Sequence, residues 1–153
     1  MDNPEVLVVR REAAAAVPVY AHGDDAGADL AIVEDVTLAP GARQVVGTGV
    51  CVAIPAGFAG FVYPRSGLAA RCGLSMVNSP GVIDAGYRGE IRICLLNTDQ
   101  SQPIHLSKGD LVAQMVIQRV EHGEYAEVEA LPDSHRGTGG YGSSGGVAAW
   151  RTT

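Results

Sequence analysis

The sequence predicts an all-β fold, a sandwich or barrel formed by a single domain. Short apolar runs recur along the chain, and a proline or glycine signal separates one run from the next. Twenty glycines and eight prolines in 153 residues favour many turns and few long helices. The chain is long enough to bury a core, because 46% of its residues are hydrophobic.

Six runs are expected to form strands. Turn signals such as Pro40-Gly41 and Gly109-Asp110 lie between them. A further strand is expected after the acidic segment DDAGADL (24–30). In chain order the six are VLVV (6–9), QVVGTGVCVAI (44–54), GFAGFVYP (57–64), EIRICLLN (90–97), LVAQMVIQRV (111–120) and YAEVEAL (125–131).

Two segments have the composition of a helix. REAAAAV (11–17) is rich in alanine, but it is short and Pro18 follows it, so helix and loop both remain open. RSGLAARCG (65–73) follows a strand and ends at a glycine, which suits about one and a half helical turns.

The apolar periodicity stops near Pro132, and glycine dominates from there on. We therefore expect a folded domain over residues 1–131 and a flexible C-terminal arm over residues 132–153, which carries the segment RGTGGYGSSG (136–145). The role of Trp150 near the end of this arm stays open.

Composition excludes several kinds of partner. The net charge of −6 and the pI near 5.1 argue against a surface for nucleic acid, which needs a basic face. They leave room for a small anion held by a few arginines and a metal ion. The three cysteines and four histidines lack metal-ligand spacing. Arg10 and Arg11 split the first apolar stretch, so we expect a cytoplasmic protein with no membrane partner.

The segment PRSGLAAR (64–71) predicts an anion site. A strand runs into a short helix there, and free backbone N–H groups at a helix start attract anions. Arg65 offers a planar guanidinium to phosphate oxygens, and Ser66 adds a hydroxyl. The simpler alternatives are a helix cap for Ser66 and a solvent-facing Arg65.

The segment NSPGVIDAGYRGEI (78–91) predicts a tight turn that carries a carboxylate. Ala85-Gly86 suits a hairpin tip, with Asp84 beside it and Tyr87 just beyond. A carboxylate at this place can orient and deprotonate a water, as a general base does. An ordinary turn-forming role for Asp84 is the alternative.

Two further segments carry polar groups suited to a nucleotide. Asp29 in DDAGADL can hold the Mg²⁺ of a triphosphate, directly or through water. Gln114 in KGDLVAQ (108–114) can donate to a phosphate oxygen. Solvated turn acids and a cross-strand contact of Gln114 are the corresponding alternatives.

The segment RGTGGYGSSG has the parts of a cover for a nucleotide. Glycine lets backbone N–H groups approach an anion closely, and Arg136 offers a guanidinium to phosphate. Ser143 and Ser144 add hydroxyl donors, and Tyr141 presents a flat ring. Taken alone, the segment is more typical of a disordered Gly/Ser tail.

Taken together and in this order, the segments AGADL, PRSG, NSPGVIDAGYRGEI, KGDLVAQ and RGTGGYGSSG resemble the five motifs of the homotrimeric dUTPase family, over residues 4–146. The resemblance implies a β-jelly roll that forms a homotrimer, with three active sites at subunit interfaces. It implies Mg²⁺-dependent hydrolysis of dUTP to dUMP and pyrophosphate by water attack on the α-phosphorus. This reaction keeps uracil out of DNA and supplies dUMP for dTMP synthesis.

The resemblance also implies roles for matching positions. Asp84 matches the aspartate that activates the water, and Asp29 matches the one that holds Mg²⁺ through water. Tyr87 packs under the deoxyribose and excludes a 2′-hydroxyl, while Tyr141 of the arm stacks on uracil. Arg65 and Gln114 assist catalysis through the phosphates. The remaining implied substrate contacts are Ser66, Gly67, Asn78, Gly81, Val82, Ile83, Arg136, Gly140, Gly142, Ser143 and Ser144.

Two positions depart from the commonest family pattern. Val82 replaces a frequent threonine, which is expected to loosen one side-chain contact and to leave the implied backbone contacts to uracil intact. Tyr141 stands where phenylalanine is usual, and it keeps a ring for stacking.

Two alternatives of different kinds remain. A dCTP deaminase, or a bifunctional deaminase and dUTPase, shares this fold, but such enzymes use a glutamate to activate water against C4 of cytosine. A catalytically silent nucleotide-binding scaffold has no need of both Asp84 and the complete glycine-rich arm.

Overall fold

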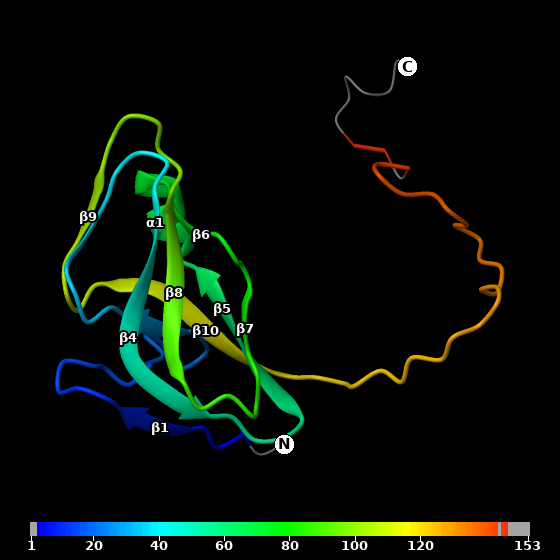
Figure 1. Ribbon diagram of the computed structural model, residues 1–153, viewed down its shortest axis with the longest axis horizontal. Helices are drawn as coiled ribbons and strands as arrows, with labels where there is room; N and C mark the ends of the chain where they lie inside the picture. Colours follow the sequence, from blue (N-terminus) through cyan, green and yellow to red (C-terminus); the bar gives the residue numbers. More distant parts are fainter. Residues whose placement is uncertain (1–2, 144, 147–153) are drawn as a thin grey trace. The chain divides into compact units, whose positions relative to one another are not determined.

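The computed structural model describes residues 3–143, 145 and 146. The chain divides into two compact units, Met1–Glu121 and His122–Thr153. Every strand and helix found in the described residues lies in the first unit (Figure 1). The predicted division into a domain over 1–131 and an arm over 132–153 stays a prediction.

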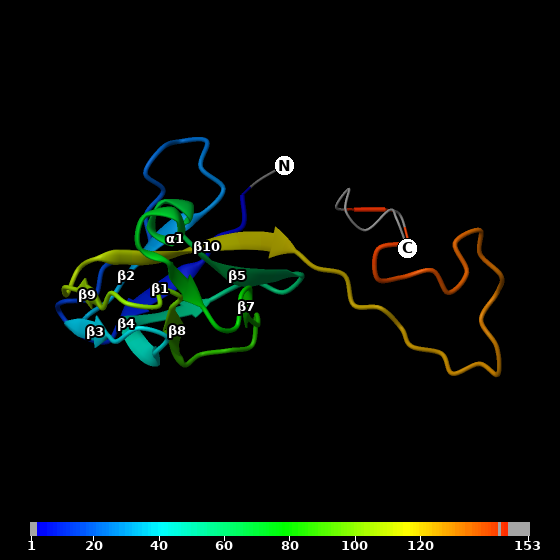
Figure 2. The same cartoon turned by 90° about the horizontal axis from the view of Figure 1, so that it is seen from above.

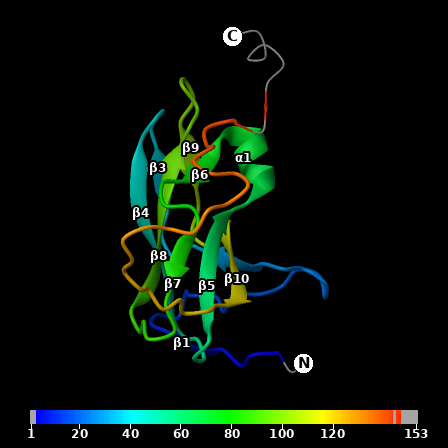
Figure 3. The same cartoon turned by 90° about the vertical axis from the view of Figure 1, so that its right-hand side faces the viewer.

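The first unit contains two four-stranded antiparallel sheets and one two-stranded sheet. Figures 1 and 3 show β4 and β8 in one layer and β5 and β10 in another, and Figure 2 shows β10 running along the length of the unit. The first sheet has the order β1 (Leu7–Arg10), β4 (Arg43–Ala53), β8 (Glu90–Asn97), β6 (Leu74–Met76). The second has the order β2 (Ala28–Ala31), β10 (Leu111–Arg119), β5 (Phe58–Pro64), β7 (Gly81–Ile83). The third pairs β3 (Val36–Leu38) with β9 (Ile104–Leu106).

Side-chain alternation along the strands builds one apolar core in this unit. In β8, Ile91, Ile93 and Leu95 are fully buried, and the residues between them are half-buried or exposed. The same core takes in side chains from β2, β3, β4, β6, β9 and β10. This architecture confirms the predicted all-β fold.

Asn97 is a buried polar residue that joins three segments of the first unit. Its Nδ2 lies 3.1, 3.2 and 2.9 Å from the carbonyl oxygens of Leu38, Ala39 and Gln102. Its Oδ1 accepts the backbone N–H of Asp99 at 2.9 Å. The loops after β3 and β8 are therefore tied together through one side chain, since buried polar groups require partners.

Of the two segments with the composition of a helix, one forms a helix and the other does not. The helix α1 (Ser66–Cys72) forms as predicted, and Gly73 ends it with a φ of 70°. Residues 11–17 form turns instead of a helix, with the N–H of Ala15 donating to the carbonyl of Glu12 at 3.1 Å. Ala15 is buried against the core, so the alanine run packs without repeating helical hydrogen bonds.

The strand predicted over residues 125–131 is wrong. A strand needs a neighbour whose N–H and C=O groups pair with its own. Among the described residues this segment has no such neighbour, and Tyr125 and Leu131 are exposed.

No helix found in the described ranges is long and apolar enough to cross a membrane.

Candidate active site

A cavity of about 490 Å³ gathers the residues of the first unit that we expect to contact phosphate. We call it the Arg65 cavity. Asp29 reaches it from β2, Arg65 and Ser66 from the start of α1, and Gln114 from β10. It is also lined by Ala21, His22, Asp25, Ala26, Gly27, Gly67, Leu68 and Arg71.

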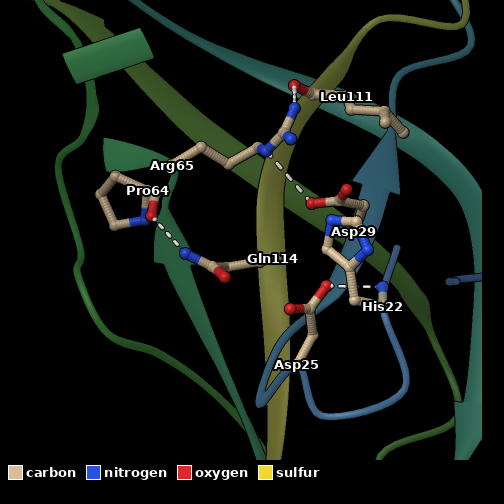
Figure 4. Close-up of polar contacts among 7 residues, drawn as sticks. All are labelled: His22, Asp25, Asp29, Pro64, Arg65, Leu111 and Gln114. Carbon is tan, nitrogen blue, oxygen red and sulfur yellow. Dashed lines mark hydrogen bonds and ion pairs between the residues drawn. The ribbon is translucent and has the colours of Figure 1, made fainter. Parts of the chain in front are cut away.

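Arg65 and Asp29 form an ion pair in this cavity (Figure 4). Nε of Arg65 lies 3.1 Å from Oδ1 of Asp29, and the two side chains are 35% and 12% exposed. Nη1 of Arg65 donates to the carbonyl of Leu111 at 2.9 Å. A guanidinium has five N–H donors, so these two contacts orient it and leave other donors for an anion.

Gln114 packs directly over the backbone of Gly27. A Cβ added at Gly27 would lie 3.1 Å from Cβ and Cδ of Gln114 and closer still to Oε1. Nε2 of Gln114 donates to the carbonyl of Pro64 at 3.0 Å (Figure 4). The Nε2 of Gln114 carries a second hydrogen besides the one donated to Pro64. A side chain in place of the glycine of AGADL would therefore force Gln114 to shift.

Ser66 is the first residue of α1 and does not cap it. The N-cap is Arg65, whose backbone is extended, with φ −94° and ψ 126°. No side chain makes a capping hydrogen bond at this helix start. The capping alternative for Ser66 is therefore not realised in this structure.

A second cavity, of about 230 Å³, gathers the residues of the segment NSPGVIDAGYRGEI. We call it the Asp84 cavity. Its lining is Val62, Met76, Asn78, Gly81, Val82, Ile83, Asp84, Tyr87, Glu90 and Arg92. The six residues expected at the uracil, the sugar and the attacking water thus all lie around one hollow.

Asp84 begins a tight turn in which the N–H of Tyr87 donates to the carbonyl of Asp84 at 3.0 Å. The hairpin predicted around this turn is wrong. The preceding strand β7 pairs with β5, whereas the following strand β8 pairs with β4 and β6. The turn therefore carries the chain from one sheet to the other.

The Arg65 cavity and the Asp84 cavity have no lining residue in common. In one chain the predicted site residues of the first unit thus fall into two groups. One group has the expected phosphate contacts and two carboxylates, and the other has the candidate base and the residues expected at the uracil and the sugar.

The glycine-rich segment of the second unit forms successive tight turns. Nε of Arg136 donates to the carbonyl of Gly139 at 2.7 Å, and the N–H of Ser143 donates to the carbonyl of Gly140 at 3.0 Å. Tyr141 has a φ of 45°, and its side chain is fully exposed. Gly142 follows with a φ of 91°. Ser144 and Trp150 lie outside the described residues.

The carboxylates of the Arg65 cavity suit a metal ion that is also bound to the phosphates of a ligand. The described residues include no group of three His, Cys, Asp or Glu side chains able to hold a metal alone. Asp25 and Asp29 both line the cavity, and Oδ2 of Asp25 accepts the N–H of His22 at 2.8 Å (Figure 4). Mg²⁺ typically takes one or two carboxylates together with waters and substrate phosphates.

A family model described as dUTPase matches residues 13–145. The chain belongs to the dUTPase family. This confirms the family and the class of enzyme, a dUTP diphosphatase, that the five motifs predict.

Relatives and solved dUTPases resemble the chain over most of its length. The deoxyuridine 5'-triphosphate nucleotidohydrolase of Thermobifida fusca (strain YX) is 60% identical over 133 residues, which are 87% of this chain and 74% of the relative. That of Rhodococcus erythropolis is 52% identical over 147 residues, 96% of this chain and 90% of the relative.

Two solved structures confirm the dUTPase-like jelly roll. The dUTPase of Staphylococcus bacteriophage 80alpha with dUPNHPP superposes with a TM-score of 0.85 at 30% identity, over 92% of this chain and 98% of that one. A mutant dUTPase from phage phi11 of S. aureus, which reveals the coordination of a structural Mg(II) ion, has a TM-score of 0.77 at 28% identity, over 82% and 97%.

The structure adds residues to the site that the motifs do not single out. Arg71 lines the Arg65 cavity, and its place as the second arginine of PRSGLAAR is a signal that sequence analysis can use. Glu90 and Arg92 line the Asp84 cavity from β8. Glu90 lies near the end of the segment NSPGVIDAGYRGEI and Arg92 follows that segment, but the pattern itself predicts no role for either side chain.

Proposed function

We propose that the protein hydrolyses dUTP to dUMP and pyrophosphate as a homotrimer, by attack of a water on the α-phosphorus, with Mg²⁺ on the triphosphate. The grouping of the predicted residues carries this proposal. The Arg65 cavity supplies phosphate donors and carboxylates, and the Asp84 cavity supplies a base beside a pocket for a nucleoside. The two relatives named as nucleotidohydrolases of this substrate support it.

The triphosphate binds in the Arg65 cavity. The protein has a net charge of −6, so a ligand with about four negative charges needs cations close by. Arg65 and Arg71 supply two, and Gln114 supplies an amide donor. Asp29 would hold Mg²⁺ through water, and the ion would supply further neutralisation of the phosphate oxygens.

Asp84 acts as the general base. Its carboxylate is exposed at the turn and lines the same cavity as Tyr87. It orients a water and accepts the proton of that water as the oxygen bonds to the α-phosphorus and pyrophosphate leaves. The reaction asks little covalent chemistry of the protein, so positioning and charge stabilisation dominate.

The Asp84 cavity selects the nucleoside. Asn78 and the backbone of residues 81–83 contact the uracil edge, and Tyr87 packs against the sugar. Cytosine presents an amine where uracil presents a carbonyl. It would leave buried polar groups unpaired, which lowers catalytic efficiency by orders of magnitude.

A complete site draws on more than one subunit. The resemblance to homotrimeric dUTPases implies this arrangement, and the division of the expected contacts between two cavities is compatible with it. The arm completes the site, with Tyr141 on the uracil, and Arg136, Ser143 and Ser144 on the phosphates. Closure of such a segment excludes water during the reaction.

Pyrophosphate release with Mg²⁺ from dUTP, dCTP, UTP and dTTP tests the proposal. We expect release from dUTP alone. Ammonia from dCTP would assign the chain to the deaminases that share the fold. Silence with all four, together with measurable nucleotide binding, would make the chain a binding scaffold.

In the cell this reaction would keep uracil out of DNA and supply dUMP for dTMP synthesis. The cytoplasmic location expected from the sequence remains a prediction.

A further inference from the structure

Glu90 lines the Asp84 cavity together with Tyr87, and the proposed reaction gives it no role. It is the first residue of β8 and is half-buried. Its Oε1 accepts the backbone N–H of Gly49 at 2.8 Å. A carboxylate that lines the Asp84 cavity thus forms a hydrogen bond with the backbone of β4.

β4 is irregular near Gly49. The register between β4 and β8 shifts between Gly47 and Cys51, and Gly49 has a φ of 66°. Such a bulge leaves backbone groups without a partner in the ladder. The Glu90 carboxylate supplies an acceptor for one of them, and a charged acceptor makes a stronger hydrogen bond than a neutral one. The start of β8 is thereby fixed to β4.

The backbone of Glu90 in turn holds Tyr87. The Tyr87 hydroxyl donates to the carbonyl of Glu90 at 2.9 Å. The ring rests on Gly89, where an added Cβ would lie 2.5 Å from Cζ and 2.8 Å from Cε2 of Tyr87. The ring is therefore held between a glycine backbone and a hydrogen bond at its hydroxyl.

We propose that Glu90 is a positioning residue for substrate selection. Its contact with Gly49 fixes the carbonyl that holds the Tyr87 hydroxyl, and thereby fixes the ring that rejects a ribonucleotide. This inference rests on the proposed function, in which Tyr87 packs against the deoxyribose.

The physical basis is the stiffness of the ring. Steric exclusion of a 2′-hydroxyl is only as strong as the resistance of the wall that meets it, and supporting hydrogen bonds provide that resistance. A loosened ring yields to UTP, whereas dUTP has no group that pushes against it. The ratio of kcat/KM for dUTP to that for UTP therefore reports on Glu90.

The test compares this ratio in four proteins. In Glu90→Ala we expect the ratio to fall about tenfold, as for loss of one strong supporting hydrogen bond. Glu90→Gln keeps an Oε1 acceptor for Gly49 and should stay within about threefold of the unchanged protein. Glu34→Ala is the matched control, because Oε1 of Glu34 accepts the N–H of Gly47 at 3.4 Å and Glu34 lines neither cavity. An unchanged ratio in Glu90→Ala would overturn the proposal.

A double-mutant cycle tests the link between the two residues. Tyr87→Phe keeps the ring and removes the hydroxyl, so it should lower the ratio by a similar factor. Tyr87→Phe combined with Glu90→Ala should lose no more than the larger single effect. Additive losses would show that the residues act separately and would refute the inference.

The outcomes separate this inference from the proposed function. Failure of the unchanged protein to hydrolyse dUTP overturns the proposed function. Hydrolysis of dUTP with unaltered rejection of UTP in Glu90→Ala overturns only the role of Glu90. If Glu90→Ala does not fold, as judged by thermal unfolding, the ratio in Tyr87→Phe decides, and an unchanged ratio there overturns the proposal.

Discussion

Nε of Arg65 lies 3.1 Å from Oδ1 of Asp29, which couples the candidate phosphate-binding cation to the candidate metal-holding carboxylate. The carbonyl of Leu111 accepts a hydrogen bond from Nη1 of the same guanidinium. A neutral substitution of Asp29 therefore has two effects at once, because it removes a negative charge from the proposed metal site and frees one side of Arg65.

Asp29→Asn should raise the Mg²⁺ concentration needed for half-maximal dUTP hydrolysis by about tenfold, because a neutral amide attracts the cation less strongly. Initial rates over a Mg²⁺ titration at saturating dUTP measure this. Asp25→Asn is the control, since that carboxylate lines the same cavity but accepts the N–H of His22. An equal Mg²⁺ requirement in the two variants would contradict the assignment of Asp29 as the carboxylate that holds the metal ion.

Asp84→Asn should leave dUTP binding within a few-fold of normal and lower turnover by about 10²-fold or more, because an amide cannot accept the proton of the attacking water. Calorimetric titration with dUTP and a pyrophosphate assay give the two readouts. Loss of binding with retained turnover per bound ligand would contradict the base assignment.

Mixed assemblies test whether a site draws on two chains. Arg65→Ala and Asp84→Asn each damage a different cavity. If Arg65 of one subunit works with Asp84 of its neighbour, random trimers of the two variants regain about a quarter of the normal sites, one in each mixed trimer. Activity of the co-refolded mixture measures this, with each variant refolded alone as the control. A mixture no more active than its parts would assign each site to one chain.

Deletion of residues 136–153 should leave the assembly intact and cripple dUTP hydrolysis. The deleted segment carries Arg136 and Tyr141, whereas the core and both cavities lie in the first unit. Loss of the cover that excludes water is expected to lower turnover by about 10²-fold or more. Light scattering reports the assembly and pyrophosphate release the activity. Full activity in the truncated protein would exclude the arm from the mechanism.

Asn97→Ala should lower the free energy of unfolding by about 2–4 kcal/mol, because one buried and two partly buried hydrogen bonds from its amide are lost at once. The contacts at stake are those to Leu38, Ala39 and Gln102. Urea unfolding measures the change, and Gln100→Ala in the same loop is the exposed control. Equal stability of the two variants would mean that the Asn97 contacts contribute nothing net.

The longer elements could be predicted from the sequence because their periodicity spans enough residues. The runs that became β4, β5, β8 and β10 have apolar residues at strand spacing and turn signals at both ends. The three-residue strands β3, β6, β7 and β9 are too short to show a period. The alternation of residues 125–131 meets the local requirement for a strand, but pairing depends on a neighbour that sequence does not reveal.

The motifs predict candidate site residues, but not how these residues are held. The segment around Asp84 predicts a turn from its glycines, while the pairing of its two flanking strands with different sheets is a non-local outcome. The packing of Gln114 on Gly27 and the contact of Glu90 with Gly49 likewise join residues that are far apart in sequence. Local patterns carry no information on such contacts.

The turn from Asp84 to Tyr87 is a mechanical link between the two sheets, because β7 before it belongs to one sheet and β8 after it to the other. A change in the spacing of the sheets therefore acts on the turn that carries the candidate base Asp84 and Tyr87. Core substitutions remote from both cavities should then alter turnover without touching any site residue. On heating, activity should decline before the sheets come apart.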